Sequence, residues 1–260
     1  AAHDNLGMTL LLDGQFKEGW AEYTWRTGQD VFLSGERVLD KPFWNGSDLD
    51  GQTLLLFAGQ GLGDTIQFFR YLPMVAAQGG DVILQCPAPL IKLFEASPVA
   101  ADIQLVTKIG DTPFDLQAPL HGLPGLFATT LDTIPADVPY LAAEEDRVAL
   151  WRSRIGGEGF QVGIAWQGNP SYKADRERSI PLRFFEPLSK IPGVRLISLQ
   201  KHDGLDQLKA LPPDMTVETL SDDFDDGADA FIDTAAVMTG LDLIITSDTA
   251  VPHLAGALGA

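Results

Sequence analysis

Short apolar runs alternate along most of the chain with segments whose apolar positions follow helical spacing. Runs bounded by glycine, proline or polar residues are typical of strands, and the longer periodic segments are typical of helices. The predicted strands are 53–58, 82–86, 103–106, 114–116, 162–166, 194–199 and 243–246. The predicted helices are 65–77, 89–96, 120–127, 146–154, 181–190, 202–210, 231–239 and a last one from Ala250. Strands that alternate with helices predict parallel sheets in an α/β fold.

The alternation breaks at residues 135–140, where two prolines lie close together, and it resumes near residue 162. Such a break is typical of a domain junction. We therefore expect two Rossmann-like domains, 51–140 and 141–260. A ligand cleft is expected between them, at the carboxyl ends of their strands.

The N-terminal residues 3–27 follow helical spacing and predict a helical hairpin. Their glycine and apolar positions resemble a tetratricopeptide repeat (TPR) without its usual first tryptophan. Two interpretations stay open: residues 1–30 are the last repeat of a longer array, or they are an ordinary hairpin packed on the next domain. Residues 31–50, rich in proline, glycine and polar positions, predict a linker laid over a surface.

The stretch 241–259 combines a strand, a polar turn and a helix. Its apolar run 243–246 is typical of a strand buried on both faces, and Ser247-Asp248-Thr249 is a helix-capping sequence. A strand that enters a helix through such a turn presents free backbone N–H groups, which bind anions. Asp248 and Thr249 act either as part of an anion site or only as helix caps, and local chemistry does not decide between these roles.

Composition excludes several classes of protein. The net charge of −18 argues against a general nucleic-acid or anionic-membrane binder, and no apolar run reaches membrane-spanning length. The first residues lack the features of a signal peptide. The single cysteine, Cys86, allows no internal disulfide or zinc cluster and is expected to be a buried small hydrophobe. A cytoplasmic location is the expectation.

A glycine-rich loop, Gly59-x-Gly61-x-Gly63-Asp64, follows the first predicted strand. It resembles a dinucleotide fingerprint, but the second strand ends in Gln85-Cys86-Pro87 without the acid that NAD binding requires. Two roles stay open for Asp64. It projects into the cleft beside a closely approaching ligand, or it caps the following helix.

Six stretches in order, covering residues 43–259, resemble the TPR-linked glycosyltransferases similar to heptosyltransferases (glycosyltransferase family 9). They are Gly61-Leu62-Gly63-Asp64-Thr65-Ile66-Gln67-Phe68-x-Arg70-Tyr71, Asp115-Leu116-x-x-Pro119-Leu120-x-x-Leu123-Pro124, Ile134-Pro135-x-x-Val138-Pro139-Tyr140-Leu141, Val162-Gly163-Ile164-x-Trp166-x-Gly168-Asn169, Asp175-Arg176-x-Arg178-Ser179-Ile180-Pro181 and Asp233-Thr234-Ala235-Ala236 through Asp248-Thr249-Ala250-x-x-His253-Leu254-Ala255-Gly256-Ala257. The resemblance implies a GT-B architecture, in which two Rossmann-like domains face a cleft. It places the acceptor on the first domain and the nucleotide-sugar donor on the second.

Two departures from this family pattern matter. The sequence ends at Ala260, directly after the proposed phosphate-site helix, whereas relatives usually continue with more sheet and a terminal helix. We therefore expect a truncated donor domain. Residues 221–229 form an acidic insertion, whose spacing fits no EF-hand, so we expect a solvated acidic loop and not a metal site.

The residues give chemical roles to several side chains. Asp64 is the candidate general base, in the acceptor-side loop with Gly61, Gly63 and Gln67. Arg176 and Arg178 suit a diphosphate, although Asp175 and Glu177 equally suit them as partners of surface arginines. The other donor-side candidates are Gln200, Lys201, Asp248, Thr249, Ala250 and His253. His121 and His202 are expected at the surface.

The function expected is transfer of a sugar from a nucleotide-diphosphate sugar to a hydroxyl acceptor, without a metal or other cofactor and with inversion. A non-catalytic scaffold and a nucleotide-sugar epimerase are the alternatives. Expected partners are the nucleotide sugar, a protein or lipopolysaccharide-type glycan acceptor, and a protein bound by the TPR-like segment. The sugar, the nucleotide base and the oligomeric state stay open.

Overall fold

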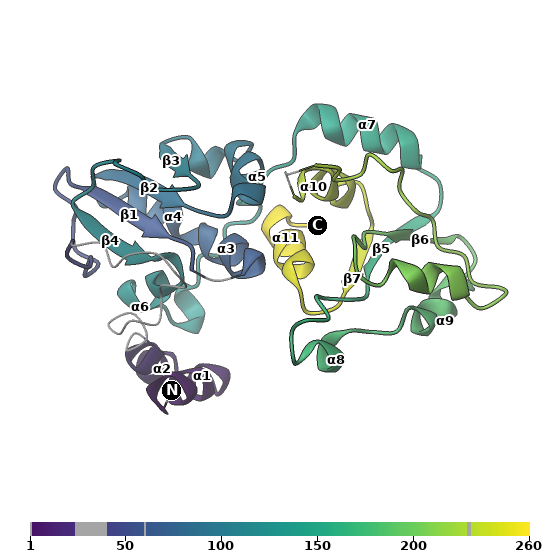
Figure 1. The fold of residues 1–260 in the computed structure, drawn as a ribbon, viewed down its shortest axis with the longest axis horizontal. Helices are drawn as coiled ribbons and strands as arrows, with labels where there is room; N and C mark the ends of the chain where they lie inside the picture. The colour runs from purple at the N-terminus through teal and green to yellow at the C-terminus, as the bar shows by residue number, and fades with distance from the viewer. Residues whose placement is uncertain (1, 24–40, 60, 228–229) are drawn as a thin grey trace. The chain divides into compact units, whose positions relative to one another are not determined.

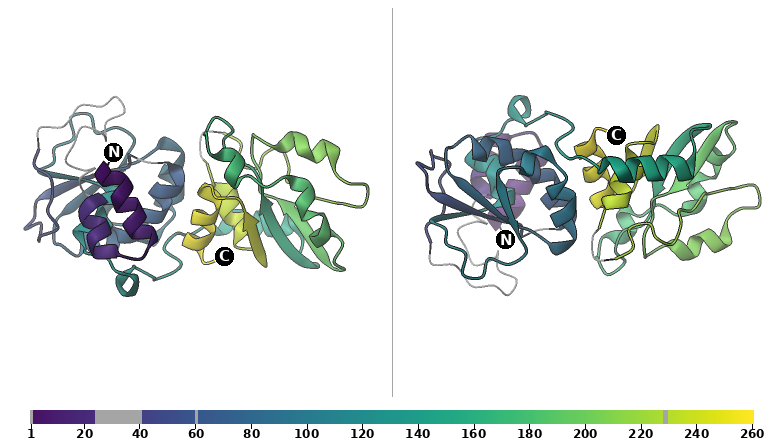
Figure 2. Two further views of the ribbon diagram at one scale, coloured as in Figure 1. Left: turned by 90° about the horizontal axis from the view of Figure 1, so that it is seen from below. Right: turned by 90° about the horizontal axis from the view of Figure 1, so that it is seen from above.

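The computed structural model describes residues 2–23, 41–59, 61–227 and 230–260. The chain divides into two units, the first comprising Ala1–Ile91 and Pro98–Asp137 and the second Lys92–Ser97 and Val138–Ala260. The division between Asp137 and Val138 lies within residues 135–140. Each unit is built on a parallel sheet with helices packed against it (Figures 1 and 2).

The sheet of the first unit has the strand order β3-β2-β1-β4, which is the order of a Rossmann half. Its strands are β1 (Thr53–Phe57), β2 (Asp81–Gln85), β3 (Ile103–Val106) and β4 (Leu116–Pro119). The middle residues of β1 and β2 are buried, as expected for apolar runs in a parallel sheet. The strand predicted at 114–116 begins two residues later, at Leu116, and ends three residues later, at Pro119. The Asp115 carboxylate accepts a hydrogen bond from the N–H of Thr53 at 2.9 Å, so its side chain caps the sheet edge where β4 begins.

The helices of this unit are shorter than the sequence predicts. They are α3 (Leu62–Phe68), α4 (Leu72–Ala76), α5 (Ile91–Glu95, which extends into the second unit) and α6 (Leu123–Leu126). A 3-10 turn at Phe69–Tyr71 separates α3 from α4. Since α3 begins at Leu62, Gly63 and Asp64 lie in its first turn and not in a preceding loop, which corrects the predicted start at residue 65.

The N-terminal helices α1 (Ala2–Leu12) and α2 (Phe16–Tyr23) form a hairpin that lies beside α6 (Figure 1). Trp20 donates its indole N–H to the carbonyl of Thr129 at 2.9 Å, and the Tyr23 ring packs edge-on against His121. His121 is 1% exposed, so its predicted surface location was wrong. The structure thus has two packed helices at this position, and their likeness to a TPR stays a prediction. Residues 24–40, the end of the predicted hairpin and most of the linker, lie outside the described residues.

The end of the predicted linker belongs to the first unit. Trp44 and Leu49 are buried, and Phe43 forms an isolated parallel bridge with Gln117 of β4. The indole of Trp44 packs edge-on against Phe127. This segment is irregular, as predicted, but its apolar residues extend the core.

The second unit has a three-stranded sheet in the order β6-β5-β7. The strands are β5 (Phe160–Ala165), β6 (Val194–Ser198) and β7 (Leu243–Thr246). One core cluster of this unit comprises Val162, Ile164, Trp166, Leu182, Phe185, Leu196 and Met215. The expectation that β7 is buried on both faces was wrong: Leu243 is 44% exposed and the rest of the strand is half-buried. Within the described residues β7 pairs only with β5, which makes it an edge strand.

The helices of the second unit are α7 (Glu145–Ile155), α8 (Asp175–Arg178), α9 (Glu186–Ser189), α10 (Ile232–Met238) and α11 (Ala250–Leu258). A 3-10 turn at Leu182–Phe185 precedes α9, and the predicted helix 202–210 is a 3-10 segment at Leu205–Ala210. It starts late because Gly204 adopts a left-handed conformation, with φ of +84°. His202 is exposed, as predicted.

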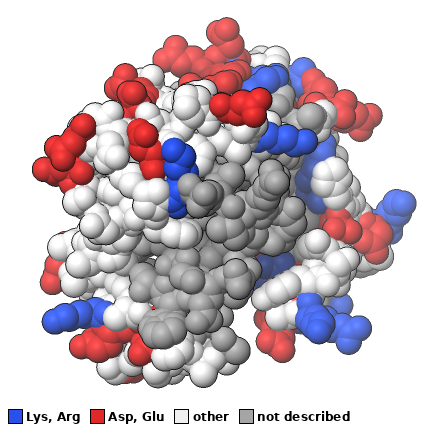
Figure 3. Space-filling view, turned by 60° about the vertical axis from the view of Figure 1, so that its left-hand side comes forward, with Lys and Arg blue, Asp and Glu red and all other residues white. Residues whose placement is uncertain are grey.

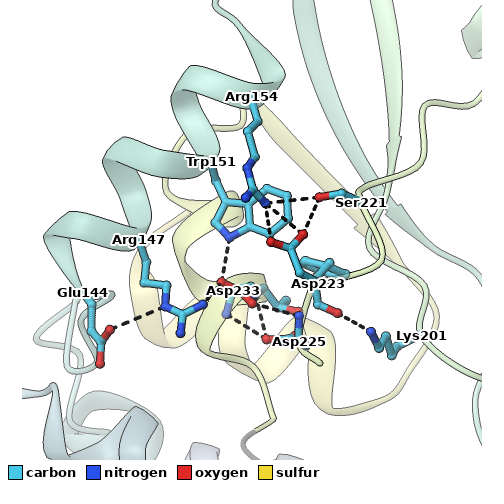
Figure 4. A network of polar contacts seen from close by, with 11 residues as sticks. Glu144, Arg147, Trp151, Arg154, Lys201, Ser221, Asp223, Asp225 and Asp233 are labelled. Carbon is cyan, nitrogen blue, oxygen red and sulfur yellow. Dashed lines mark hydrogen bonds and ion pairs between the residues drawn. The ribbon is translucent and has the colours of Figure 1, made fainter. Parts of the chain in front are cut away.

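Asp233, at the start of α10, anchors α7 through buried hydrogen bonds (Figure 4). Its carboxylate accepts from the Arg147 guanidinium at 2.8 Å, the Trp151 indole at 2.7 Å and the backbone N–H of Asp225 at 2.9 Å. In return, the Asp225 carboxylate accepts from the backbone N–H of Asp233 at 2.7 Å and from the hydroxyl of Thr234. Asp225 therefore caps α10, and Asp233 attaches α7 to it.

The prediction of a solvated acidic loop at 221–229 is wrong at its centre. Phe224 is buried edge-on against Trp151, and Asp225 is half-buried under α10. Burial raises the pKa of Asp225, against the opposing effect of its hydrogen bonds from Thr234 and Asp233. Asp222 and Asp226 are exposed, as predicted. The segment has the composition of a surface loop, but Phe224 anchors it against Trp151.

Replacing Asp233 by Ala should destabilise the second unit by about 2–4 kcal/mol, because it leaves the indole N–H of the buried Trp151 and a backbone N–H without acceptors. Denaturant unfolding, with hydrogen exchange of the α7 amides, measures the loss. Asp222→Ala, which removes an exposed acid from the same segment, should change stability by less than about 0.5 kcal/mol. Equal effects of the two substitutions would contradict this assignment.

Candidate functional site

The carboxyl ends of β5, β6 and β7 lie at one edge of the second unit's sheet. Ala165 is opposite Thr246, and Ile164 is opposite Ser198, so the three strands end within about a residue of one another. The loops that follow carry most of the polar residues predicted for donor binding. This is the edge at which open α/β sheets bind ligands.

Helix α11 begins at Ala250, as predicted, and Thr249 is its N-cap. The Thr249 hydroxyl accepts a hydrogen bond from the N–H of Val251 at 3.3 Å. Capping and anion binding are compatible here, because a first helical turn has more free N–H groups than one hydroxyl satisfies. The preceding Ser247 is buried, and within the described residues its hydroxyl has no hydrogen-bond partner.

Arg178 reaches the start of α11 from 70 residues away in the sequence. Its Nη1 donates to the backbone carbonyl of Asp248 at 2.8 Å, and its guanidinium carbon lies 4.7 Å from the centre of the Tyr172 ring. The Nε group donates to Asp175 at 3.2 Å. Arg178 and the α11 N-terminus are therefore adjacent, whereas Arg176 is exposed on α8.

The Asp248 side chain is exposed beside this start of α11, and His253 is half-buried one turn into the helix. Asp248 thus contributes its carbonyl to the Arg178 contact, and its carboxylate points into solvent. The sequence predicted both residues as donor-site candidates, because they lie close to Thr249 in the chain. It did not predict the contact made by the Asp248 backbone.

Gln200 and Lys201 lie at the end of β6, and both make internal contacts. The Gln200 amide oxygen accepts from the N–H groups of Trp166 and Gln167 at 2.8 and 3.0 Å, and its nitrogen donates to the carbonyls of Gln167 and Asp203. The Lys201 ammonium donates to the carbonyl of Phe224 and lies 5.6 Å from the centre of that ring. Gln200 therefore joins the ends of β5 and β6.

Asp64 lies in the first unit, with Gly61, Gly63 and Gln67. Its Oδ2 accepts from the backbone N–H of Gly61 at 3.2 Å, so Asp64 caps the start of α3. The side chain is half-buried, Gln67 is half-buried on the same helix, and Gly61 is exposed. A role for Asp64 as a general base stays a prediction.

The acidic composition of the protein bears on whether it can bind an anion. Figure 3 shows acidic and basic side chains interspersed around the edge of one face, and the net charge is −18. An anionic ligand must overcome that field through local positive groups. Among the described residues, no cluster of His, Cys, Asp and Glu side chains has the arrangement of a metal site.

No protein-family model matches the chain. The chain is 28% identical to Protein FlbA of Caulobacter vibrioides over 270 residues, covering 96% of this chain and 45% of FlbA. It thus spans about half the length of that curated relative.

Several solved glycosyltransferase structures resemble the chain in fold. The family 9 glycosyl transferase of Veillonella parvula has a TM-score of 0.63 at 14% identity, over 84% of this chain and 81% of that one. ADP-heptose lipopolysaccharide heptosyltransferase II of E. coli has a TM-score of 0.56 at 14% identity, over 79% and 82%. The dodecameric iron-containing glycosyltransferase TibC of enterotoxigenic E. coli has 0.54 at 15%, over 87% and 61%.

At these identities the likeness establishes the fold. The chain has the α/β fold of the family 9 glycosyltransferases. This fold agrees with the two parallel sheets of the described residues. None of the helices in the described ranges is both long and apolar enough to cross a membrane.

Replacing Gln200 by Ala should lower the stability of the ligand-free protein by about 1–3 kcal/mol, because the N–H groups of Trp166 and Gln167 lose their acceptor. A melting curve without nucleotide measures the loss, and Lys209→Ala at an exposed position is the control. An unchanged melting temperature with weakened nucleotide binding would instead indicate a direct ligand contact.

Proposed function

We propose that the chain is the catalytic part of a glycosyltransferase that moves a sugar from a nucleotide-diphosphate sugar to a hydroxyl acceptor. The observation that carries this proposal is the hydrogen bond from Arg178 to the Asp248 carbonyl, which holds a guanidinium beside the N-terminus of α11. The family 9 fold supports it, and so does the position of this contact at the carboxyl edge of the sheet.

The chemistry of this corner suits a diphosphate. A guanidinium has five N–H donors, and the described residues use one on Nε and one on Nη1 of Arg178. The remaining donors and the first-turn amides of α11 are available to anionic oxygens. In the proposed reaction these groups stabilise the leaving nucleoside diphosphate, which is the task that a metal performs in other enzymes. The exposed Asp248 carboxylate would accept a hydrogen bond from a sugar hydroxyl.

The proposed step forms a bond between the acceptor oxygen and the anomeric carbon. The bond between that carbon and the diphosphate oxygen breaks, and the acceptor proton passes to Asp64. Direct attack from the opposite face inverts the anomeric centre. This requires an acceptor bound by the first unit and a donor bound by the second, so the predicted cleft between the domains is part of the proposal.

An ADP-linked sugar is the first donor to test. Heptosyltransferase II of E. coli is named for ADP-heptose, and TibC has been solved with ADP-D-β-D-heptose. For the acceptor, a protein hydroxyl and a lipopolysaccharide-type glycan are both within the proposal. The N-terminal hairpin, which packs on the rest of the first unit through Trp20 and Tyr23, is the proposed surface for a protein partner.

Removing either half of the diphosphate site should weaken ADP binding. We expect Arg178→Ala and Thr249→Val each to cost about 1–3 kcal/mol, roughly a fivefold to hundredfold rise in Kd, as for charge-assisted hydrogen bonds. Isothermal titration calorimetry measures it, with the exposed Arg183→Ala as a charge-matched control. Wild-type affinity in both site variants would remove this assignment.

Asp64→Asn should abolish most of the transfer and leave the fold intact. The Asn side chain can still accept from the Gly61 N–H, so stability should stay within about 1 kcal/mol of the parent. Transfer should fall roughly a hundredfold or more, since Asn cannot take a proton, and ADP affinity should persist. A transfer assay with ADP-heptose and a melting curve test this. Retained transfer would leave Asp64 only a helix cap, and donor turnover without any acceptor would indicate an epimerase.

A further inference from the structure

Asp175 is a buried carboxylate at the proposed anion site. It is 6% exposed, although a surface position would suit its place in the polar sequence Ala174-Asp175-Arg176-Glu177. A negative charge here repels a diphosphate. Its presence therefore requires an explanation beyond surface solubility.

The Asp175 carboxylate is bonded at both oxygens. Oδ1 accepts from Arg178 Nε at 3.2 Å, and Oδ2 accepts from the Ser179 hydroxyl at 3.0 Å. The Ser179 oxygen in turn accepts from the backbone N–H of Gly168 at 3.1 Å, just after β5. Asp175 is thus tied to the end of the central strand, and Arg178 is tied to Asp175.

The Arg178 guanidinium is constrained further by close packing. A Cβ atom on Gly168 would lie 2.5 Å from Asp175 Oδ1 and 2.6 Å from Arg178 Nη2, so a side chain there would displace both groups. Tyr172 stacks on the guanidinium, and the Asp248 carbonyl accepts from Nη1. The Arg178 side chain is 24% exposed and is held by four neighbours before any ligand arrives.

We propose that Asp175 is a positioning residue for the donor diphosphate: it fixes the guanidinium plane of Arg178 so that Nη2 and the free hydrogen of Nη1 are ready for phosphate oxygens. This inference rests on the proposed function. An arginine carries many rotamers, and a guanidinium ordered in advance binds without losing that freedom again. Asp175 thus weakens the electrostatic attraction between the site and a diphosphate, but it keeps the Arg178 guanidinium oriented for binding.

The two effects of Asp175 have opposite signs, and this makes the inference testable. If the carboxylate only repels the ligand, removing its charge strengthens ADP binding. If it orients Arg178, removing it weakens binding in spite of the more favourable charge. We expect Asp175→Asn to raise the Kd of ADP about threefold to tenfold, the scale of ordering one long side chain, because a neutral amide oxygen holds Arg178 Nε less tightly than a carboxylate does. Glu177→Gln removes the same charge from an exposed position of α8 and should leave Kd unchanged or lower it.

Calorimetry with ADP on the full chain tests this in a double-mutant cycle. In an Arg178→Ala background, Asp175→Asn should no longer raise the Kd, because Asp175 orients the ligand site through Arg178; the loss of its negative charge should leave the Kd unchanged or lower it. Tighter binding by Asp175→Asn alone would overturn the inference, and so would an equal loss in the Arg178→Ala background, which would indicate general structural damage.

Two further arms keep the result decisive. If Asp175→Asn does not fold, Ser179→Ala replaces it, since it keeps the charge but removes the tether, and an unchanged Kd would overturn the inference. If the wild-type chain does not bind ADP or any other nucleoside diphosphate, the proposed function fails and the inference fails with it. Binding by the wild type with an unchanged Kd in Asp175→Asn removes the inference alone.

Discussion

Strand β5 pairs with both other strands of the second unit's sheet, and that pairing sets the position of the proposed donor site. Parallel strands in register end together, so the residues after β5, β6 and β7 leave the sheet at one edge. Gly168, Gln200 and Thr249 follow these three ends. A slip of one residue in either pairing would turn alternate side chains to the opposite face and separate these groups. The arrangement of polar groups at this edge therefore depends on the apolar residues that hold the three strands in register.

Much of this fold could be predicted because a buried parallel strand leaves a strong local signal. The apolar run at 243–246 located β7 to the residue, and the run at 194–199 located β6 within one. The burial of β7 could not be predicted in the same way, since a central and an edge strand can share one apolar pattern. His121 and Phe224 were misplaced for a related reason. Their burial depends on Tyr23 and Trp151, which lie far away in the sequence.

In the candidate site, too, local features could be predicted from the sequence, whereas contacts between distant residues could not. Thr249 was predictable as a helix N-cap, because capping is a property of adjacent residues. The contact between Arg178 and the Asp248 carbonyl required the fold, because 70 residues separate them. Asp175 and Glu177 are nearly equivalent in sequence, yet one is buried against Arg178 and the other is exposed. A carboxylate shows its role only when its neighbours in space are known.

The attachment of the N-terminal hairpin has a mechanical consequence. A segment joined to a domain by chain alone limits how far apart the two can move, but it leaves rotation free. Trp20 and Tyr23 hold α2 at two separate points, Thr129 and His121, and His121 lies in the 3-10 turn Leu120–Gly122 that directly follows β4. Two points of attachment on one short helix resist swivelling as well as separation. The hairpin is therefore held at a fixed angle to β4. A segment or protein that packs on the outer surface of the hairpin is then also oriented relative to β4.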